Sequence, residues 1–107
     1  MALFALSFGL VVSAAAQPPA TPTRTAVIEA MGTIQGTIAR CVREHGAGHG
    51  RFYIVFDFRA DGSVADAELE PKYAQTPFGL CVQNAAMSVR LPAFGHASFR
   101  VRFPFRH

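Results

Sequence analysis

The chain has 107 residues and a formal net charge of +3, with ten Lys and Arg against seven Asp and Glu. Hydrophobic residues make up 50% of it, and ten phenylalanines but no tryptophan are among them. This length and composition predict one small domain with an aromatic-rich core and exclude a multidomain architecture. The positive charge favours binding to anionic surfaces or acidic proteins.

The first segment, residues 1–16, carries no charged side chain. An apolar run over residues 2–12 is followed by the small residues 13–16, a pattern typical of a secretory signal peptide that is cleaved before Gln17. The first cation is Arg24, whereas signal peptides usually begin with one. An uncleaved membrane anchor is the alternative, but a spanning helix needs about 20 apolar residues. We therefore expect a periplasmic or secreted protein.

Residues 17–24 are rich in proline and threonine and predict an extended linker that does not pack, leaving residues 25–107 as the folded domain. Apolar residues then recur at spacings of three and four, which predicts one amphipathic helix ending before the glycine-rich segment 46–50. Gly32 and Gly36 weaken this helix by about 1 kcal/mol each relative to alanine. Its apolar positions are Val27, Ile28, Met31, Ile34, Ile38, Cys41 and Val42.

Residues 51–58 alternate in polarity and predict a strand, with Tyr53 and Val55 on the face opposite its phenylalanines. Asp61-Gly62 predicts a tight turn, after which residues 63–70 return as a second strand. We expect Ala65, Ala67 and Leu69 to face the core and Asp66, Glu68 and Glu70 to face solvent. Val64 breaks this alternation, so either a β-bulge or an outward apolar contact is expected there.

Thr76-Pro77 predicts the start of a second helix, with Thr76 as N-cap and Pro77 at the first helical position. This helix is expected to continue to Leu91, because the residue before a proline avoids helical angles. Residues 99–105 predict the last strand, in which phenylalanine and valine alternate with Arg100, Arg102 and Pro104.

These elements predict an α+β fold in the order helix, strand, strand, helix, strand. The most apolar strand belongs in the middle of the sheet, and the strand with Pro104 belongs at an edge because proline cannot donate to a ladder. The prediction is a three-stranded antiparallel sheet of order 2-1-3, with two helices on one face.

Cys41 and Cys81 are the only two cysteines, and in an exported domain such a pair predicts one disulfide. Closing a loop of about 40 residues stabilises the fold by roughly 3–4 kcal/mol. Two independent buried thiols are the alternative. A metal pair is disfavoured because no C-x-x-C motif accompanies the cysteines.

Residues 50–64 (GRFYIVFDFRADGSV) resemble the hairpin of the TonB C-terminal domain family, and the later helix and last strand follow in that family's order. The closer resemblance is to the cysteine-containing branch at the C-termini of gliding-motility-associated envelope proteins, where one cysteine ends a helix before the hairpin, as Cys41 does, and another opens the later helix, as Cys81 does. It covers roughly residues 27–105. The resemblance implies a TonB C-terminal-like, non-catalytic periplasmic module that binds partner proteins, typically by accepting a peptide strand beside its last strand.

Mapped onto this sequence, that edge is the segment 98–105, whose arginines favour an acidic partner segment from the cell envelope. Alternatively, these arginines only protect the edge from aggregation. The outer face of the central strand is expected to contact a partner, the linker or a second copy of the chain as a homodimer. The predicted partner-binding residues are Ser98, Phe99, Arg100, Val101, Arg102, Tyr53 and Val55.

A second hypothesis is binding of anionic polymers or a membrane surface through the basic last strand. Nucleic acid is not a predicted partner, because such sites usually need clustered cations with stacking aromatics, and these phenylalanines are expected to face the core. Contact with a membrane is otherwise expected only through an uncleaved leader.

An enzyme or metal protein is the third hypothesis. His45 and His49 are four residues apart, but glycines between them place them in a loop instead of on one helical face. His96 and His107 are isolated in the sequence, whereas zinc needs three or four convergent ligands. We predict no catalytic residue, no cofactor and no metal site.

Overall fold

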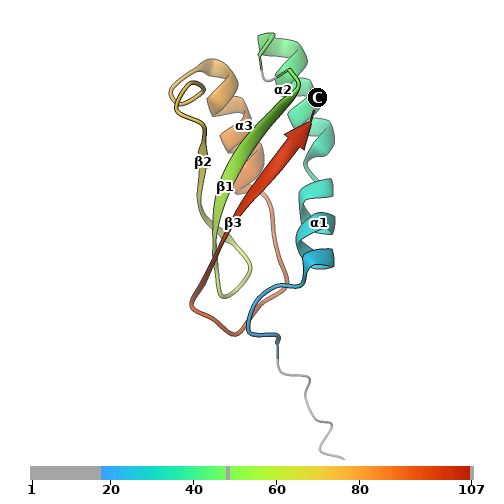
Figure 1. Cartoon of the computed structure of the whole chain (residues 1–107), viewed down its shortest axis with the longest axis vertical. Helices are drawn as coiled ribbons and strands as arrows, with labels where there is room; N and C mark the ends of the chain where they lie inside the picture. Colours follow the sequence, from blue (N-terminus) through green and yellow to red (C-terminus); the bar gives the residue numbers. More distant parts are fainter. Residues whose placement is uncertain (1–17, 48, 107) are drawn as a thin grey trace, which may run out of the picture.

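Strand β1 (Arg51–Arg59) forms the centre of the fold. The computed structural model describes residues 18–47 and 49–106 (Figure 1). In it, β1 pairs antiparallel with β2 (Val64–Leu69) on one side and with β3 (Ser98–Arg106) on the other. The predicted three-stranded antiparallel sheet of order 2-1-3 is therefore confirmed.

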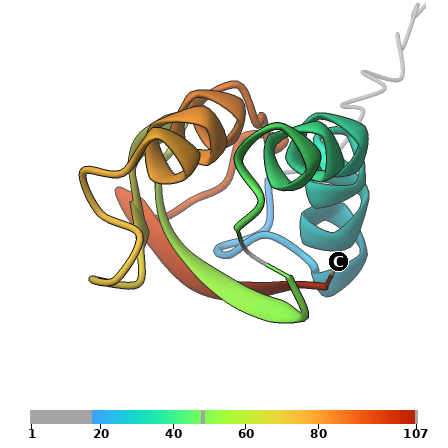
Figure 2. The same cartoon turned by 90° about the horizontal axis from the view of Figure 1, so that it is seen from above.

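The two faces of β1 differ as its alternation predicts. Phe52, Ile54, Phe56 and Phe58 are fully buried, whereas Tyr53 and the other residues of the opposite face are partly exposed. The helices lie on the concave face of the curved sheet (Figure 2). The phenylalanines of β1 belong to the buried core on that side. The outer, convex face has no helix over it in the described part of the chain.

The predicted first helix is in fact two helices, α1 (Arg24–Gly32) and α2 (Gln35–His45), so the element order is ααββαβ. Thr33 stops α1 because its hydroxyl donates to the carbonyl of Ala30 at 2.6 Å, while Ile34 N–H bonds Met31 in a tighter turn. Because α1 ends there, its buried face consists of Val27, Ala30 and Met31. Ile28, expected on the apolar face, is 50% exposed.

A β-bulge interrupts β2 at the position where the sequence loses its alternation. Phe58 pairs with Val64 and Asp57 pairs with Asp66, so Ala65 is the extra residue. The predicted bulge is confirmed, and Ala67 and Leu69 face the core as expected, but Ala65 does not. Val64 is buried and Ala65 is exposed, because the extra residue shifts the alternation by one position.

Helix α3 (Pro77–Met87) begins where predicted, with Thr76 Oγ1 accepting a hydrogen bond from Gly79 N at 2.9 Å. It ends four residues before the expected Leu91, because the Ser88 hydroxyl donates to the Ala85 carbonyl and caps the last turn. The segment after it crosses the hairpin turn, where Leu91 N donates to Gly62 O at 2.9 Å. Gly62 has a φ of +89°, and a Cβ there would lie 1.7 Å from the Leu91 carbonyl oxygen. Only glycine fits this turn.

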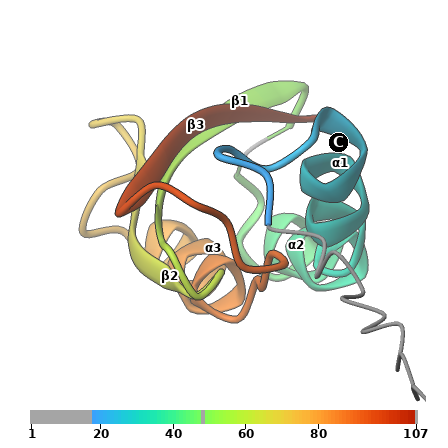
Figure 3. The same cartoon turned by 90° about the horizontal axis from the view of Figure 1, so that it is seen from below.

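The described part of the segment predicted as a non-packing linker is bound to the domain. Gly95 N donates to Pro19 O at 2.8 Å and His96 N donates to Ala20 O at 3.0 Å, which fixes residues 19–20 beside the loop before β3 (Figure 3). Thr23 then caps α1 by accepting a hydrogen bond from Ala26 N. The predicted signal peptide, residues 1–16, lies outside the described residues.

None of the helices in the described ranges has the length and apolarity needed to cross a membrane.

Candidate functional site

The outer edge of β3 is defined by which backbone groups point away from β1. Tyr53 N donates to the Glu70 carboxylate at 3.2 Å, so the peptide group of Tyr53 faces the β2 side. Tyr53 pairs with Pro104 across the sheet. The two therefore form a pair without mutual hydrogen bonds, and Pro104 directs its backbone away from β1. The missing N–H of Pro104 thus costs the β1–β3 ladder nothing.

Alternation along β3 then assigns the other outward groups. Ser98, Arg100 and Arg102 share the orientation of Pro104, so their N–H and C=O groups point to the outer edge. Within residues 18–47 and 49–106, no hydrogen bond reaches this edge and no strand pairs with it. The result is a row of donors and acceptors that an added strand could bond, ending at Pro104.

Arg100 and Arg102 project from the outer face of β3 but already have contacts within the chain. Arg100 Nη1 lies 3.5 Å from Asp57 Oδ2, and the two side chains are 65% and 32% exposed. The guanidinium carbon of Arg102 lies 4.0 Å from the ring centroid of Tyr53, a cation–π contact. Both arginines are positioned by β1, which the sequence did not reveal.

Phe99 and Val101 point to the other face, where they are half-buried against the core. Phe99 packs edge-on against Phe94 at a centroid distance of 6.0 Å. These two predicted partner-binding residues can therefore contribute only main-chain groups to an edge contact. Tyr53 and Val55 do lie on the outer face beside the arginines.

A shallow hollow of about 310 Å³ lies at the centre of the outer face. Carboxylates from the β2 side contribute to it, whereas the sequence pattern predicts only that they face solvent. Their alternation along β2 was the signal that places them on the same face as Tyr53. The residues lining the hollow are Tyr53, Val55, Glu68, Leu69, Glu70, Pro71 and Arg102.

The opposite edge of the sheet, formed by β2, lies beside α3. Gln83 Nε2 on α3 donates to the Ala67 carbonyl at 3.0 Å and so occupies an acceptor on that edge. A groove of about 390 Å³ lies between β2 and α3, with the half-exposed Leu80 on its α3 side. In contrast to β3, this edge is held by a side chain of the same chain.

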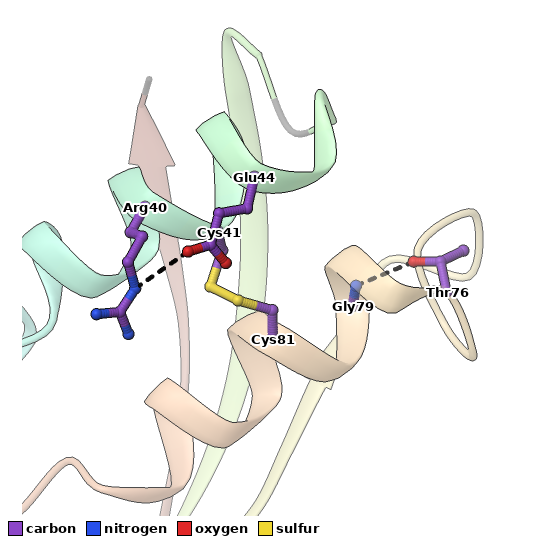
Figure 4. The surroundings of a disulfide bond; sticks show 6 residues. All are labelled: Arg40, Cys41, Glu44, Thr76, Gly79 and Cys81. Carbon is purple, nitrogen blue, oxygen red and sulfur yellow. Dashed lines mark hydrogen bonds and ion pairs between the residues drawn. A yellow bond between two sulfur atoms is a disulfide. The ribbon is translucent and has the colours of Figure 1, made fainter.

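Cys41 of α2 and Cys81 of α3 form a disulfide, with an S–S distance of 2.06 Å and a Cα–Cα distance of 5.8 Å (Figure 4). The predicted pairing is confirmed, and it joins the two helices across the concave side of the fold. Cys41 is fully buried, whereas Cys81 is partly exposed. An exposed ion pair lies beside the disulfide, with Arg40 Nε 3.8 Å from Glu44 Oε1.

One cluster in the described residues has the donor types of a metal site. Single ligand atoms of Glu44, His45 and Cys81 lie within 4.8 Å of one another. The sulfur of Cys81 is in the disulfide, however, and a thiolate is the form that binds metal. Glu44 is also paired with Arg40. The arrangement therefore provides no metal site in the oxidised protein.

Asp61, in the turn between β1 and β2, has a shifted pKa. Its carboxylate accepts hydrogen bonds from the Ser63 hydroxyl at 2.6 Å and from Ser63 N at 2.9 Å. These two bonds lower the pKa of Asp61 below its usual 3.8, with smaller contributions from nearby arginines. This Asx-type turn fixes the hairpin.

No protein-family model, curated protein or solved structure matches this chain. The resemblance to the TonB C-terminal domain family therefore depends on the residues and their order alone.

Proposed function

We propose that this protein is a non-catalytic, exported interaction module that binds an envelope protein by accepting a peptide strand along the outer edge of β3. The observation that carries the proposal is the set of outward N–H and C=O groups on Ser98, Arg100 and Arg102, which have no partner among the described residues. The TonB-like order of elements and the position of the last strand agree with this mode. Main-chain hydrogen bonds would supply affinity and alternate side chains would supply specificity.

The disulfide supports the proposed location. Disulfides persist in oxidising compartments such as the periplasm and are rare in the cytosol. Cys41 and Cys81 form one. The preferred partner segment is acidic, because Arg100 and Arg102 remain largely exposed beside the edge. Their contacts to Asp57 and Tyr53 draw both side chains over β1, and a carboxylate of the added strand would compete for them from the other side of β3.

A proline substitution distinguishes partner binding through the β3 backbone from partner binding through its side chains. Arg102→Pro removes one outward N–H without breaking the β1 ladder, because the backbone of Arg102 has the same outward orientation as that of Pro104. Arg102→Ala is the matched control, since it removes the same side chain but keeps the N–H. We expect the proline variant to lose capture of its envelope partner and the alanine variant to keep most of it.

Capture is measured by photo-crosslinking from a reactive group placed at the exposed Ser98, in extracts of the native cell envelope. Undiminished crosslinking by Arg102→Pro would exclude strand addition at this edge. Thermal unfolding of both variants, monitored by circular dichroism, confirms that each is folded.

The alternative is binding of an anionic polymer or membrane surface, which the exposed Arg100, Arg102 and Arg106 favour. Heparin and vesicles of anionic phospholipid are suitable probes. For this mode the proline and alanine variants should be weakened equally, and binding should fall steeply with salt because the arginines would act as charges. The carboxylates on the same face oppose this mode.

A further inference from the structure

The outer face of the sheet carries its charges in three columns, one on each strand. In the row through Val55, the register places Arg102 of β3 on one side and Glu68 of β2 on the other. In the row through Asp57, it places Arg100 on one side and Asp66 on the other. The β3 column is thus basic and the β2 column is acidic, with Tyr53, Val55 and Asp57 of β1 between them.

Two of the three carboxylates in the acidic column have no ionic partner in the described part of the chain. Asp66 and Glu68 form no ion pair there, and Glu70 lies 3.6 Å from Lys72. On the basic side, Arg102 is stacked on an aromatic ring instead of being paired with a carboxylate. Two side chains of opposite charge, Arg102 and Glu68, therefore flank the same hollow without an ionic partner.

The two outer columns are complementary to each other under one symmetry operation, in which the residues of β1 face their own copies. A twofold axis parallel to the strands turns a second sheet over and exchanges its two sides, so that its β3 lies over β2 of the first. Arg102 of each copy then faces Glu68 of the other, and Arg100 faces Asp66. A twofold axis across the strands would instead bring the two basic columns together.

We propose that a second copy of this chain docks on the outer face, forming a face-to-face dimer in which the basic β3 column of one protomer meets the acidic β2 column of the other. Tyr53 and Val55 would be covered at its centre, as stacked sheets pack side chains in a layer about 10 Å thick. A three-stranded face offers less than the roughly 800 Å² per partner of a typical stable interface. The dimer is therefore weak and depends on its charges.

Charge reversal in two separate variants tests this pairing. In a homodimer of either Arg102→Glu or Glu68→Arg, residues 102 and 68 carry the same charge. The twofold axis places two such like-charged pairs in each dimer. When the two variants are mixed, every cross-interface pair is again of opposite sign. Arg43→Glu and Glu29→Arg are matched controls, because both residues are exposed on helices away from this face.

The measurement is sedimentation velocity over a range of concentrations, on protein with its disulfide formed. We expect concentration-dependent dimers for the natural chain and the controls, a dissociation constant raised about tenfold or more in each single variant, and recovery in the equimolar mixture. Salt near 1 M, where the screening length is about 3 Å, should dissociate the natural dimer.

A natural chain that stays monomeric up to about 1 mM, the concentration at which even a binding free energy of −4 kcal/mol would show, overturns the proposal. A mixture that fails to recover dimers also overturns it. The strand-addition proposal is unaffected by either result, because its test compares two variants that both lack the Arg102 side chain and differ in the backbone N–H.

Discussion

The two edges of the sheet are protected in different ways. The β2 edge is short, contains a bulge at Ala65, and has the carbonyl of Ala67 bonded by Gln83 of α3. The β3 edge is nine residues long and regular, and within the described ranges no side chain bonds it. Among the described residues, the arginines and Pro104 are the features that protect it.

Natural proteins block edge strands because an open edge pairs with other chains. Here one edge has a bulge, a short strand and a side-chain cap, whereas the other keeps a run of outward donors and acceptors up to Pro104. This contrast is the reason for proposing the β3 edge as the binding surface. Three changes, at the disulfide, at Gln83 and at Asp61, test what keeps the two edges different.

The largest effect on stability should come from removing the disulfide. This bond holds α3 in place, and α3 carries Gln83, which bonds the β2 edge. Cys41→Ala together with Cys81→Ala should lower the free energy of unfolding by about 3–4 kcal/mol, because the loop of 40 residues is no longer closed in the unfolded chain. Denaturant unfolding measures this loss. Hydrogen exchange should rise in β2 more than in β3, since α3 packs against β2.

The natural protein under reducing conditions is the control for the double variant and should lose similar stability. An unfolding midpoint unchanged in the variant would contradict a stabilising role for the bond. Equal loss of protection in both edge strands would contradict the link between α3 and the β2 edge.

A smaller effect is expected when the cap itself is removed. Gln83→Ala should cost about 1 kcal/mol, the usual net value of one hydrogen bond, and should leave the Ala67 carbonyl open at the β2 edge. Asn84→Ala, at an exposed position on the same helix, is the control and should change stability little. Calorimetric melting compares the two.

The Gln83 variant should also self-associate more readily than the control, because its two sheet edges have become more alike. Light scattering at high protein concentration tests this. Equal scattering from the Gln83 and Asn84 variants would show that the bulge and the short strand suffice to protect β2.

The smallest effect concerns the turn that joins β1 to β2. Because hydrogen bonds from Ser63 lower the pKa of Asp61 in the folded state, its contribution to stability is present above the usual pKa of 3.8 and is lost as the pH falls through the lower folded value. Asp61→Asn removes this titration while keeping an acceptor oxygen. Acid titrations of stability should therefore be less steep in the variant, and superimposable curves would exclude Asp61 as a source of acid sensitivity.

Much of the sheet could be predicted from the sequence because the signals are local. The strict alternation of Phe52, Ile54 and Phe56 specifies both a strand and its buried face, and Pro104 specifies an edge. The bulge was visible as a break at Val64, but the extra residue was not, so Ala65 is exposed against expectation while Ala67 and the residues after it keep their predicted faces. The disulfide followed from the cysteine count and the expected export.

The helix boundaries were less predictable. The break after Gly32 depends on the Thr33 hydroxyl choosing the Ala30 carbonyl, and the early end of α3 depends on a similar bond from Ser88. Both hydrogen bonds reflect weak local preferences of Thr and Ser. The apolar spacing continues past each of them, so the sequence pattern predicts longer helices. Val89 is buried without being helical, so its spacing suggested a longer helix.

The candidate surface needed the three-dimensional register. Arg100, Arg102, Tyr53 and Val55 could be assigned to one face from alternation alone. That Glu68 lies across from Arg102 on the same row depends on two strand pairings and on a bulge. The contacts of the arginines with Asp57 and Tyr53 depend on the same register.

The attachment of residues 19–20 to the loop before β3 has a mechanical consequence. A pulling force applied at residue 18 would be borne first by the two hydrogen bonds from Gly95 and His96, and only afterwards by α1. Those bonds hold the loop that leads directly into Ser98. Tension on the N-terminal side of the domain would therefore reach the beginning of β3, the strand with the open edge, before it disturbs the core.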